Sequence, residues 1–188
     1  MVTLYHAPRS RSTRIIWLLE ELGAPYEITY VDIQRPTGGA RDPRNPHPDG
    51  RVPTLVHDGR LVTESIAIAL YLTDLFPANG VGPTVADPER GEYLTWLAYY
   101  AGVMEPALID RANRAEEAAK VDRRVTDALA KAPYLLGEKF SAADVFLASI
   151  MQFQRSFLPQ VKLLDDFMAR VSARPALQRA IQRDVPRV

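Results

Sequence analysis

The sequence begins MVTLYHAPRSRSTRIIWLLEELGAPYEITYV (residues 1–31), and this stretch decides the class of fold. A β-prone run, Val2–His6, ends at an Ala-Pro pair, and residues 26–31 form a second run rich in aromatic and β-branched side chains. Between the two runs, apolar residues recur at the spacing of a helix: Ile15, Leu18, Leu19 and Leu22. Gly23 follows, where a glycine often ends a helix. A strand, a helix and a strand at these distances predict a βαβ unit with parallel strands.

The next segment completes a small α/β domain. Residues 34–50 are rich in Pro, Gly, Arg and Asp, which predicts mostly loop. Two short strands are expected at Thr54–His57 and residues 60–63, and the Asp-Gly pair between them is typical of a two-residue hairpin. A helical pattern then continues to the next proline. We therefore expect residues 1–77 to fold in the order β-α-β, loop, β-hairpin, helix.

The second half of the sequence is expected to be helical throughout. Residues 77–83 contain two prolines and two glycines, and we place a linker at residues 78–84. Beyond it no convincing strand pattern appears, so residues 85–188 are expected to form an all-α domain. Its helices are predicted at these ranges: residues 87–113, Ala115–Lys131, residues 141–157, residues 164–172 and Pro175–Arg183.

The composition excludes several functions. The 188 residues include 23 basic and 23 acidic side chains, which gives no electrostatic reason to expect nucleic acid or a membrane as a partner. The absence of cysteine excludes disulfides and a catalytic thiol of the protein. The three histidines, His6, His47 and His57, lack metal-ligand spacing, so no metal is expected. No leader or membrane-spanning stretch is visible, and we expect a cytoplasmic location.

Ser10 and Ser12 lie between the first strand and the first helix. The more common role of such serines is to cap the helix. The alternative is chemical, because a helix N-terminus carries partial positive charge and free N–H groups, and a thiolate placed there has a lowered pKa. Since the protein has no thiol of its own, the thiol would belong to a bound ligand.

Two further segments allow a structural and a functional interpretation. Val52-Pro53 precedes a strand, and the bond is either an ordinary trans proline or a cis turn that offers the Val52 backbone to a peptide-like ligand. Glu64 and Ser65 open the helix after the hairpin, where they either cap it or hold a carboxylate.

Two patterns in the second half are assigned to folding. Ser141 and Asp144 have the spacing of a capping box. The aromatic residues Tyr93, Trp96, Tyr99 and Tyr100 are expected mainly in the core, with one or two free to line an apolar pocket.

Together these features resemble the glutathione transferase superfamily, over nearly the whole chain. The first-half motifs are Leu4-Tyr5, Ser10-Arg11-Ser12, Trp17 to Gly23, Pro25-Tyr26-Glu27, His47 to Leu55, and Glu64 to Ile68 with Tyr71-Leu72. The second-half motifs are Leu136-Gly137 and Phe140 to Asp144. The order of the motifs is similar to that of bacterial and fungal serine-type members. The fold implied is a thioredoxin-like N-terminal domain and an all-helical C-terminal domain.

The resemblance also implies how glutathione is held. Val52, next to Pro53, would pair with the cysteinyl backbone of the tripeptide. Glu64 and Ser65 would hold the γ-glutamyl end. The glycyl carboxylate would lie near Arg51 and, less directly, near His47.

Three side chains compete for the thiolate: Ser10, Ser12 and Tyr5. Tyr5 ends the first strand, where tyrosine-type members keep their hydroxyl. Ser10 matches the position of the serine in many serine-type members, and Ser12 lies inside the first turn, where a cap is expected. We rank Ser10 first, Ser12 second and Tyr5 third.

The activity implied is conjugation of the glutathione thiolate to a small apolar electrophile, a detoxifying reaction with glutathione as co-substrate and no metal. Members are usually homodimers. A peroxidase, isomerase or dehalogenase reaction on the same site remains an alternative, as does a non-enzymatic interaction module. The sequence is also shorter than is usual for the family, with the missing length near residues 113–117, where members shape the pocket for the second substrate.

Overall fold

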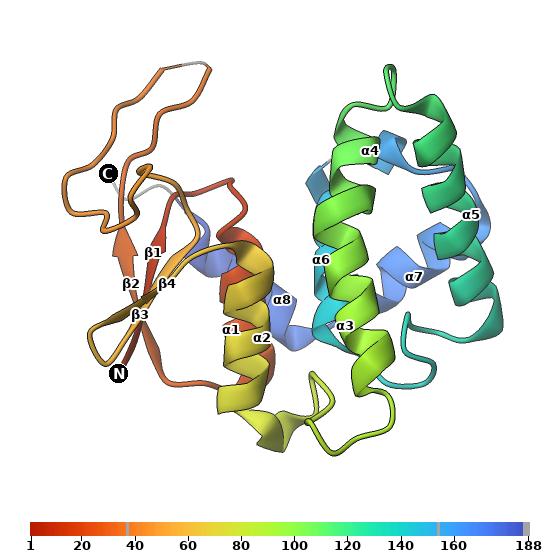
Figure 1. Ribbon diagram of the computed structural model, residues 1–188, viewed down its shortest axis with the longest axis horizontal. Coiled ribbons are helices and arrows are strands. Elements are labelled where there is room, and N and C mark those ends of the chain that lie inside the picture. The colour runs from red at the N-terminus through yellow and green to blue at the C-terminus, as the bar shows by residue number, and fades with distance from the viewer. Residues whose placement is uncertain (37, 154, 186–188) are drawn as a thin grey trace. The chain divides into compact units, whose positions relative to one another are not determined.

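The N-terminal half of the protein is built on a four-stranded mixed sheet (Figure 1). The structure is a computed structural model that describes residues 1–36, 38–153 and 155–185. The strands are β1 (Val2–His6), β2 (Tyr26–Tyr30), β3 (Thr54–His57) and β4 (Arg60–Val62). Their order in the sheet is β2-β1-β3-β4, with β1 parallel to β2 and antiparallel to β3, and with β3 and β4 forming the hairpin. The predicted βαβ unit and hairpin are confirmed.

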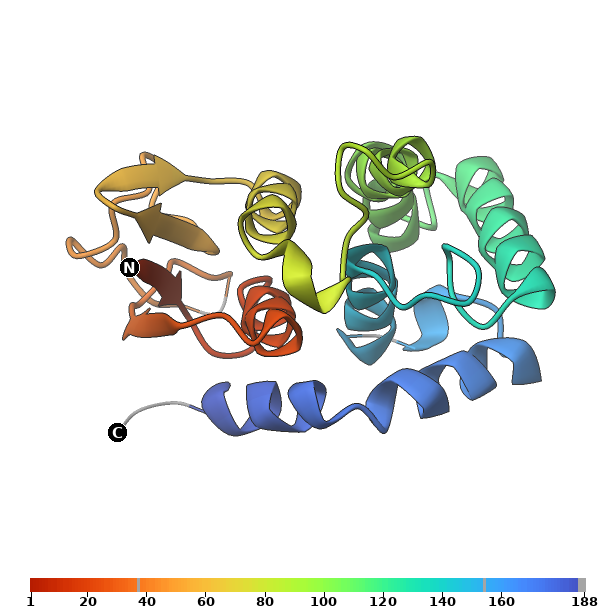
Figure 2. The ribbon, with the colours of Figure 1, turned by 90° about the horizontal axis from the view of Figure 1, so that it is seen from below.

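Helices α1 (Thr13–Leu22) and α2 (Ser65–Leu75) lie on the same side of the sheet (Figure 2). Helix α1 is buried along most of its length, because its apolar residues at helical spacing meet the sheet: Ile15, Ile16, Trp17, Leu18, Leu19 and Leu22. Gly23 ends the helix with φ 58°, a left-handed conformation that costs glycine least. The glycine therefore ends the helix where the sequence predicted.

The strand directions bring three loops to one edge of the sheet. Tyr5 near the end of β1 pairs with Thr54 at the start of β3, and Leu55 pairs with Val62 at the end of β4. The segment after β1, the segment before β3 and the segment before α2 consequently leave the sheet at the same edge. These segments contain Ser10, Val52-Pro53 and Glu64-Ser65, respectively.

The second unit of the structure consists of helices. Helix α3 (Arg90–Tyr99) continues through one π-helical stretch (Tyr100–Met104) into α4 (Glu105–Ile109), and a short join at residues 110–114 leads to α5 (Ala115–Lys131). Helices α6 (Ala142–Phe153) and α7 (Lys162–Ser172) follow. The expected helix at residues 141–157 is shorter, since α6 ends at Phe153 and a 3₁₀ turn occupies Arg155–Phe157, while residue 154 lies outside the described residues. The core includes the aromatic side chains Tyr93, Trp96 and Tyr100, as expected.

Asp144 fixes the start of α6. Its carboxylate accepts hydrogen bonds from Ser141 N–H (2.8 Å), Ser141 Oγ (2.9 Å) and Leu135 N–H (2.8 Å). The side chain is fully buried, and burial raises its pKa to about 6 against the opposing effect of these donors. The predicted capping contact is present and also ties the preceding loop to the helix.

The last helix, α8 (Pro175–Arg183), packs against α1 of the first unit. The chain therefore divides into two compact units. The first contains residues 1–79 and the C-terminal segment from residue 175, and the second contains residues 80–174. Glu20 in α1 binds Arg179 (2.6 Å) and Arg183 (3.2 Å) of α8. The sequence assigned residues 85–188 to a single helical domain and gave no sign that α8 would pack on the first unit.

None of the helices formed by the described residues is long and apolar enough to cross a membrane.

Candidate functional site

The two serines after β1 form a joined pair. The hydroxyls of Ser10 and Ser12 are 2.7 Å apart, and Ser10 also donates to the carbonyl of Ala7 at 2.7 Å. Ser10 is partly exposed, whereas Ser12 is completely buried. The accessible hydroxyl of the pair is thus that of Ser10, the residue ranked first from the sequence.

Ser12 does not cap α1, contrary to the expectation. It stands directly before the helix, but its hydroxyl turns back to the end of β1, where it accepts from Ala7 N–H at 3.3 Å and lies 2.7 Å from His6 Nδ1. The buried ring of His6 lies beside it and places Nδ1 within hydrogen-bond distance of the hydroxyl. Ser12 therefore links Ser10 to the interior of the domain.

His6 and Asp184 extend this cluster inward. The His6 ring is fully buried, and its Nε2 lies 3.2 Å from Asp184 Oδ1, without the alignment of a hydrogen bond. Asp184, just after α8, accepts hydrogen bonds from Arg9 N–H (2.9 Å) and Thr13 Oγ1 (2.8 Å). Burial alone would raise the pKa of Asp184, but the donors around it outweigh burial and hold the pKa below its usual range. The carboxylate is therefore ionised at neutral pH.

Val52-Pro53 adopts the cis form, which is the form that the functional interpretation required. Pro53 is buried and Val52 is partly exposed, immediately before β3. Among the described residues, the N–H and C=O of Val52 have no hydrogen-bond partner. A free backbone donor and acceptor on one residue fit an extended peptide that binds through its main chain.

Arg51 and His47 have different surroundings. The carbonyl of Arg51 accepts from Asn45 Nδ2 and from Thr54 Oγ1, both at 2.9 Å, while its exposed guanidinium has no recorded partner among the described residues. His47 is buried, and its Nδ1 accepts from Asp49 N–H at 3.0 Å. Arg51 is therefore an available cation, and His47 holds the loop in shape.

The start of α2 is open. No side chain caps this helix, so capping by Glu64 or Ser65, the simpler interpretation, is not what the structure shows. Glu64 has φ 65°, a left-handed backbone that costs a non-glycine residue about 1–3 kcal/mol. Uncapped N–H groups at a helix start, with a hydroxyl such as that of Ser65 beside them, are chemically suited to accept a carboxylate.

Tyr5 lies within β1 and is partly buried. Its hydroxyl makes no recorded hydrogen bond with a described residue. It does not take part in the cluster of Ser10, Ser12, His6 and Asp184.

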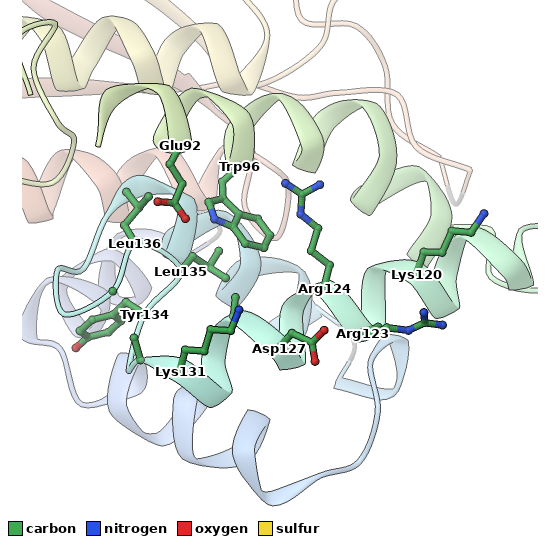
Figure 3. A pocket seen from close by; sticks show the side chains of 13 residues that line it. Glu92, Trp96, Lys120, Arg123, Arg124, Asp127, Lys131, Tyr134, Leu135 and Leu136 are labelled. Atoms are coloured by element: carbon green, nitrogen blue, oxygen red, sulfur yellow. The ribbon is translucent and has the colours of Figure 1, made fainter. Parts of the chain in front are cut away.

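A separate pocket of about 660 Å³ lies within the helical unit, lined by α3, α5 and residues 134–137 (Figure 3). Its lining combines apolar residues, among them Trp96, Leu135 and Leu136, with six charged side chains: Glu92, Lys120, Arg123, Arg124, Asp127 and Lys131. The Arg124 guanidinium lies 4.9 Å from the centre of the Trp96 ring and 4.0 Å from that of Tyr99. No metal-binding cluster of acidic and histidine side chains occurs within the described part of the chain.

Comparisons with known proteins match both halves of the chain to one family. Residues 9–75 match the family described as Glutathione S-transferase, N-terminal domain, and residues 97–175 match Glutathione S-transferase, C-terminal domain. This chain belongs to the glutathione transferase superfamily. The predicted fold class is confirmed, and at this level so is the prediction of a transferase enzyme.

Individual relatives cover the chain almost completely. Glutathione S-transferase GstA of Escherichia coli O157:H7 is 26% identical over 96% of this chain and 98% of its own length. A glutathione transferase from Methylococcus capsulatus is 28% identical, with a TM-score of 0.82 over 98% of both chains. A sphingomonad glutathione S-transferase solved in complex with glutathione is 26% identical, with a TM-score of 0.80 over 97% of this chain and 98% of that one. The chain therefore spans nearly the full length of these relatives.

Sequence reasoning missed Asp184 and, beyond excluding His6 as a metal ligand, gave that histidine no part in the site. Asp184 is separated from Thr13 by 171 positions, and no local pattern marks it. A weak signal for His6 existed, because it lies at the end of the strand that leads to Ser10.

Proposed function

We propose that this protein conjugates the thiolate of reduced glutathione to a small apolar electrophile. The observation that carries the proposal is the open start of α2, where uncapped amide groups and the Ser65 hydroxyl can hold the α-carboxylate of the γ-glutamyl residue. Glu64 beside it can bind the α-amino group of the same residue. One amino-acid end of the ligand would thus be recognised through both of its charges.

The remaining contacts follow the tripeptide along the same edge of the sheet. The free N–H and C=O of Val52, next to cis-Pro53, would pair with the cysteinyl backbone. Arg51 would reach the glycyl carboxylate, with His47 supporting the loop from below. Ser10, the exposed hydroxyl of the serine pair, would donate to the sulfur.

The chemical contribution is a lowered thiol pKa. A free thiol of the cysteine type has a pKa of about 8.5, so each unit by which the site lowers it gives about tenfold more thiolate until the working pH is reached. A hydroxyl donor at a helix N-terminus stabilises the thiolate, and the bound geometry adds proximity to the electrophile.

The test is calorimetric titration with reduced glutathione, followed by rate assays on a panel of apolar electrophiles, peroxides and mixed disulfides. We expect binding, and turnover with the electrophiles. Arg51→Ala should weaken glutathione binding by about tenfold or more, because a charge-assisted hydrogen bond is worth roughly 1.5–3 kcal/mol. Absence of binding at millimolar glutathione would reject the proposal in favour of an interaction module, and turnover of peroxides alone would replace conjugation by the alternative reaction.

We also propose that the protein is a homodimer in the cytoplasm. The support is membership of the family, whose members are usually dimeric. Light scattering at micromolar concentration should give about twice the mass of the chain, and a monomeric mass would reject the dimer without affecting the binding site.

A further inference from the structure

A buried histidine joins the serine pair to a carboxylate on the C-terminal segment. Four side chains follow one another in space. Asp184 Oδ1 is 3.2 Å from His6 Nε2, and His6 Nδ1 is 2.7 Å from Ser12 Oγ. Ser12 Oγ is in turn 2.7 Å from Ser10 Oγ. His6 and Ser12 have no exposed surface, whereas Ser10 and Asp184, at the two ends of the row, are partly exposed. The four side chains form a continuous row that leads from the partly exposed Ser10 through two buried side chains to the Asp184 carboxylate.

The neighbouring carboxylate decides where a neutral His6 carries its proton. Although Nε2 and the carboxylate lack the alignment of a hydrogen bond, a lone pair on Nε2 would lie 3.2 Å from the negative charge of Asp184, which favours the proton on Nε2. Nδ1 is then an acceptor, and the Ser12 hydroxyl must donate to it. Ser12 can in turn accept from Ser10 once the Ser10 hydroxyl turns away from the Ala7 carbonyl, its acceptor at 2.7 Å in this structure, and both hydroxyls then point towards His6.

On the basis of the proposed function, we propose that His6 takes up the thiol proton of bound glutathione through Ser10 and Ser12. The S–H bond breaks and its proton passes to Ser10 Oγ, the Ser10 proton passes to Ser12 Oγ, and the Ser12 proton passes to His6 Nδ1. The products are a thiolate and an imidazolium, with no net change in charge or in the number of protons. Every hydrogen bond in the row has then reversed, and the Ser10 hydroxyl donates to the sulfur.

Asp184 makes an imidazolium tolerable in this buried place. A buried cation without a partner is costly, whereas a carboxylate beside it both orients the ring and compensates the charge. A further titratable side chain against the ring is Tyr30 at the end of β2, whose ring meets that of His6 edge-on at 5.5 Å. Arg35 reaches the same loop from outside, through the carbonyls of Pro8 and Arg9. His6 is thus a positioning residue that acts on the sulfur through the serines.

Nitrogen-15 NMR of histidine-labelled full-length protein tests the relay. Spectra are compared for the free protein, with reduced glutathione, and with S-methylglutathione, which has no thiol proton to give. We expect the His6 ring nitrogens to move to imidazolium positions with glutathione and to stay neutral with S-methylglutathione. A His6 ring that remains neutral while ultraviolet absorbance shows bound thiolate would overturn the proposal.

Two variants separate the relay from a structural role. His6→Asn keeps a group able to bind Ser12 but has no base, and Asp184→Asn keeps an acceptor oxygen for Arg9 and Thr13 but has no charge. In each, the pKa of the bound thiol should rise by about one unit or more, which is about tenfold less thiolate at pH 7, with unchanged affinity for S-methylglutathione. The matched control is His57→Asn, because His57 is a histidine of the same sheet bound to the Tyr71 hydroxyl at 2.6 Å.

The outcomes separate a failure of the proton relay through Ser10 and Ser12 to His6 from a failure of the proposed glutathione-binding function. Failure of both glutathione and S-methylglutathione to bind removes the proposed function and the relay with it. Binding of both, with thiolate pKa values in His6→Asn and Asp184→Asn equal to that of His57→Asn, retains the function and overturns the relay.

Discussion

Ser10 and Ser12 show how two similar side chains acquire different roles from their exposure. Both hydroxyls lie within one hydrogen-bonded pair, but only Ser10 reaches the surface, while Ser12 is enclosed against His6. A ligand thiol can therefore touch Ser10 directly and Ser12 only through it. The sequence ranking of Ser10 above Ser12 remains a prediction, which the geometry now supports with a physical reason.

Ser10→Ala should lower kcat and leave the KM for glutathione nearly unchanged. The hydroxyl would stabilise the developing thiolate, while the tripeptide is held mainly at Arg51, Val52 and the start of α2. Loss of one such donor costs about 2–3 kcal/mol, or about a hundredfold in rate. Steady-state kinetics with varied glutathione and a saturating electrophile measures kcat and the KM for glutathione separately.

Ser12→Ala should show a similar but smaller loss in kcat, since it interrupts the path behind Ser10 without removing the contact to sulfur. If Tyr5→Phe lowers kcat and Ser10→Ala does not, the hydroxyl that stabilises the thiolate is that of Tyr5, and the assignment to Ser10 is wrong.

At the level of elements, the start of α6 depends on a single buried carboxylate. Asp144→Ala would leave the N–H groups of Ser141 and Leu135 buried without acceptors. We expect a loss of about 2–4 kcal/mol in the free energy of unfolding, because each buried unsatisfied group costs about 1–3 kcal/mol. Urea denaturation followed by circular dichroism gives the value, and a change below 0.5 kcal/mol would show that the contact is not needed.

The same carboxylate predicts a pH dependence of stability. Burial raises the pKa of Asp144 to about 6, against an ordinary value of 3.8 for the unfolded chain. Between these values the folded protein holds a proton that the unfolded chain has lost. The contribution of Asp144 is therefore fully present below about pH 4 and is lost as the pH rises through 6. Asp144→Asn has no such titration, so the difference in unfolding free energy between the two proteins should vary with pH in this window and be constant above pH 7.

The elements were largely predictable from sequence because their signals are local. Periodic apolar residues and a following glycine define α1, the Asp-Gly turn defines the hairpin, and α5 has the expected bounds Ala115–Lys131. The details that differ depend on which partner a polar side chain meets in the folded protein. Ser12 turns towards His6 instead of capping α1, and α2 starts without a cap. Residue types alone do not reveal which of two nearby acceptors a hydroxyl will meet.

For the whole molecule, the principal departure from the sequence-based view is the position of α8. This helix is the last in the chain, yet it packs on α1 through Ala176, Leu177 and Ala180 and brings Asp184 to the serine site. The first unit is therefore completed by the end of the chain. Contacts of such long sequence separation leave no periodicity that a reader of the sequence could use.

Leu177→Ala should destabilise the first unit in particular. The side chain is buried, and truncation of a buried leucine costs about 2–5 kcal/mol. Hydrogen exchange followed by mass spectrometry should show faster exchange in α1 and around Ser10, with α5 and α6 unchanged. Equal acceleration in the two units would mean that they unfold together and would contradict the assignment of α8 to the first.

The central claim is that this protein holds glutathione as a thiolate at neutral pH. The most direct measurement is the ultraviolet thiolate absorbance of glutathione bound to the wild-type protein, recorded against pH and compared with S-methylglutathione as the blank. The site described here predicts a pKa for the bound thiol at least one unit below that of free glutathione. A bound thiol that titrates at the same pH as free glutathione would contradict it.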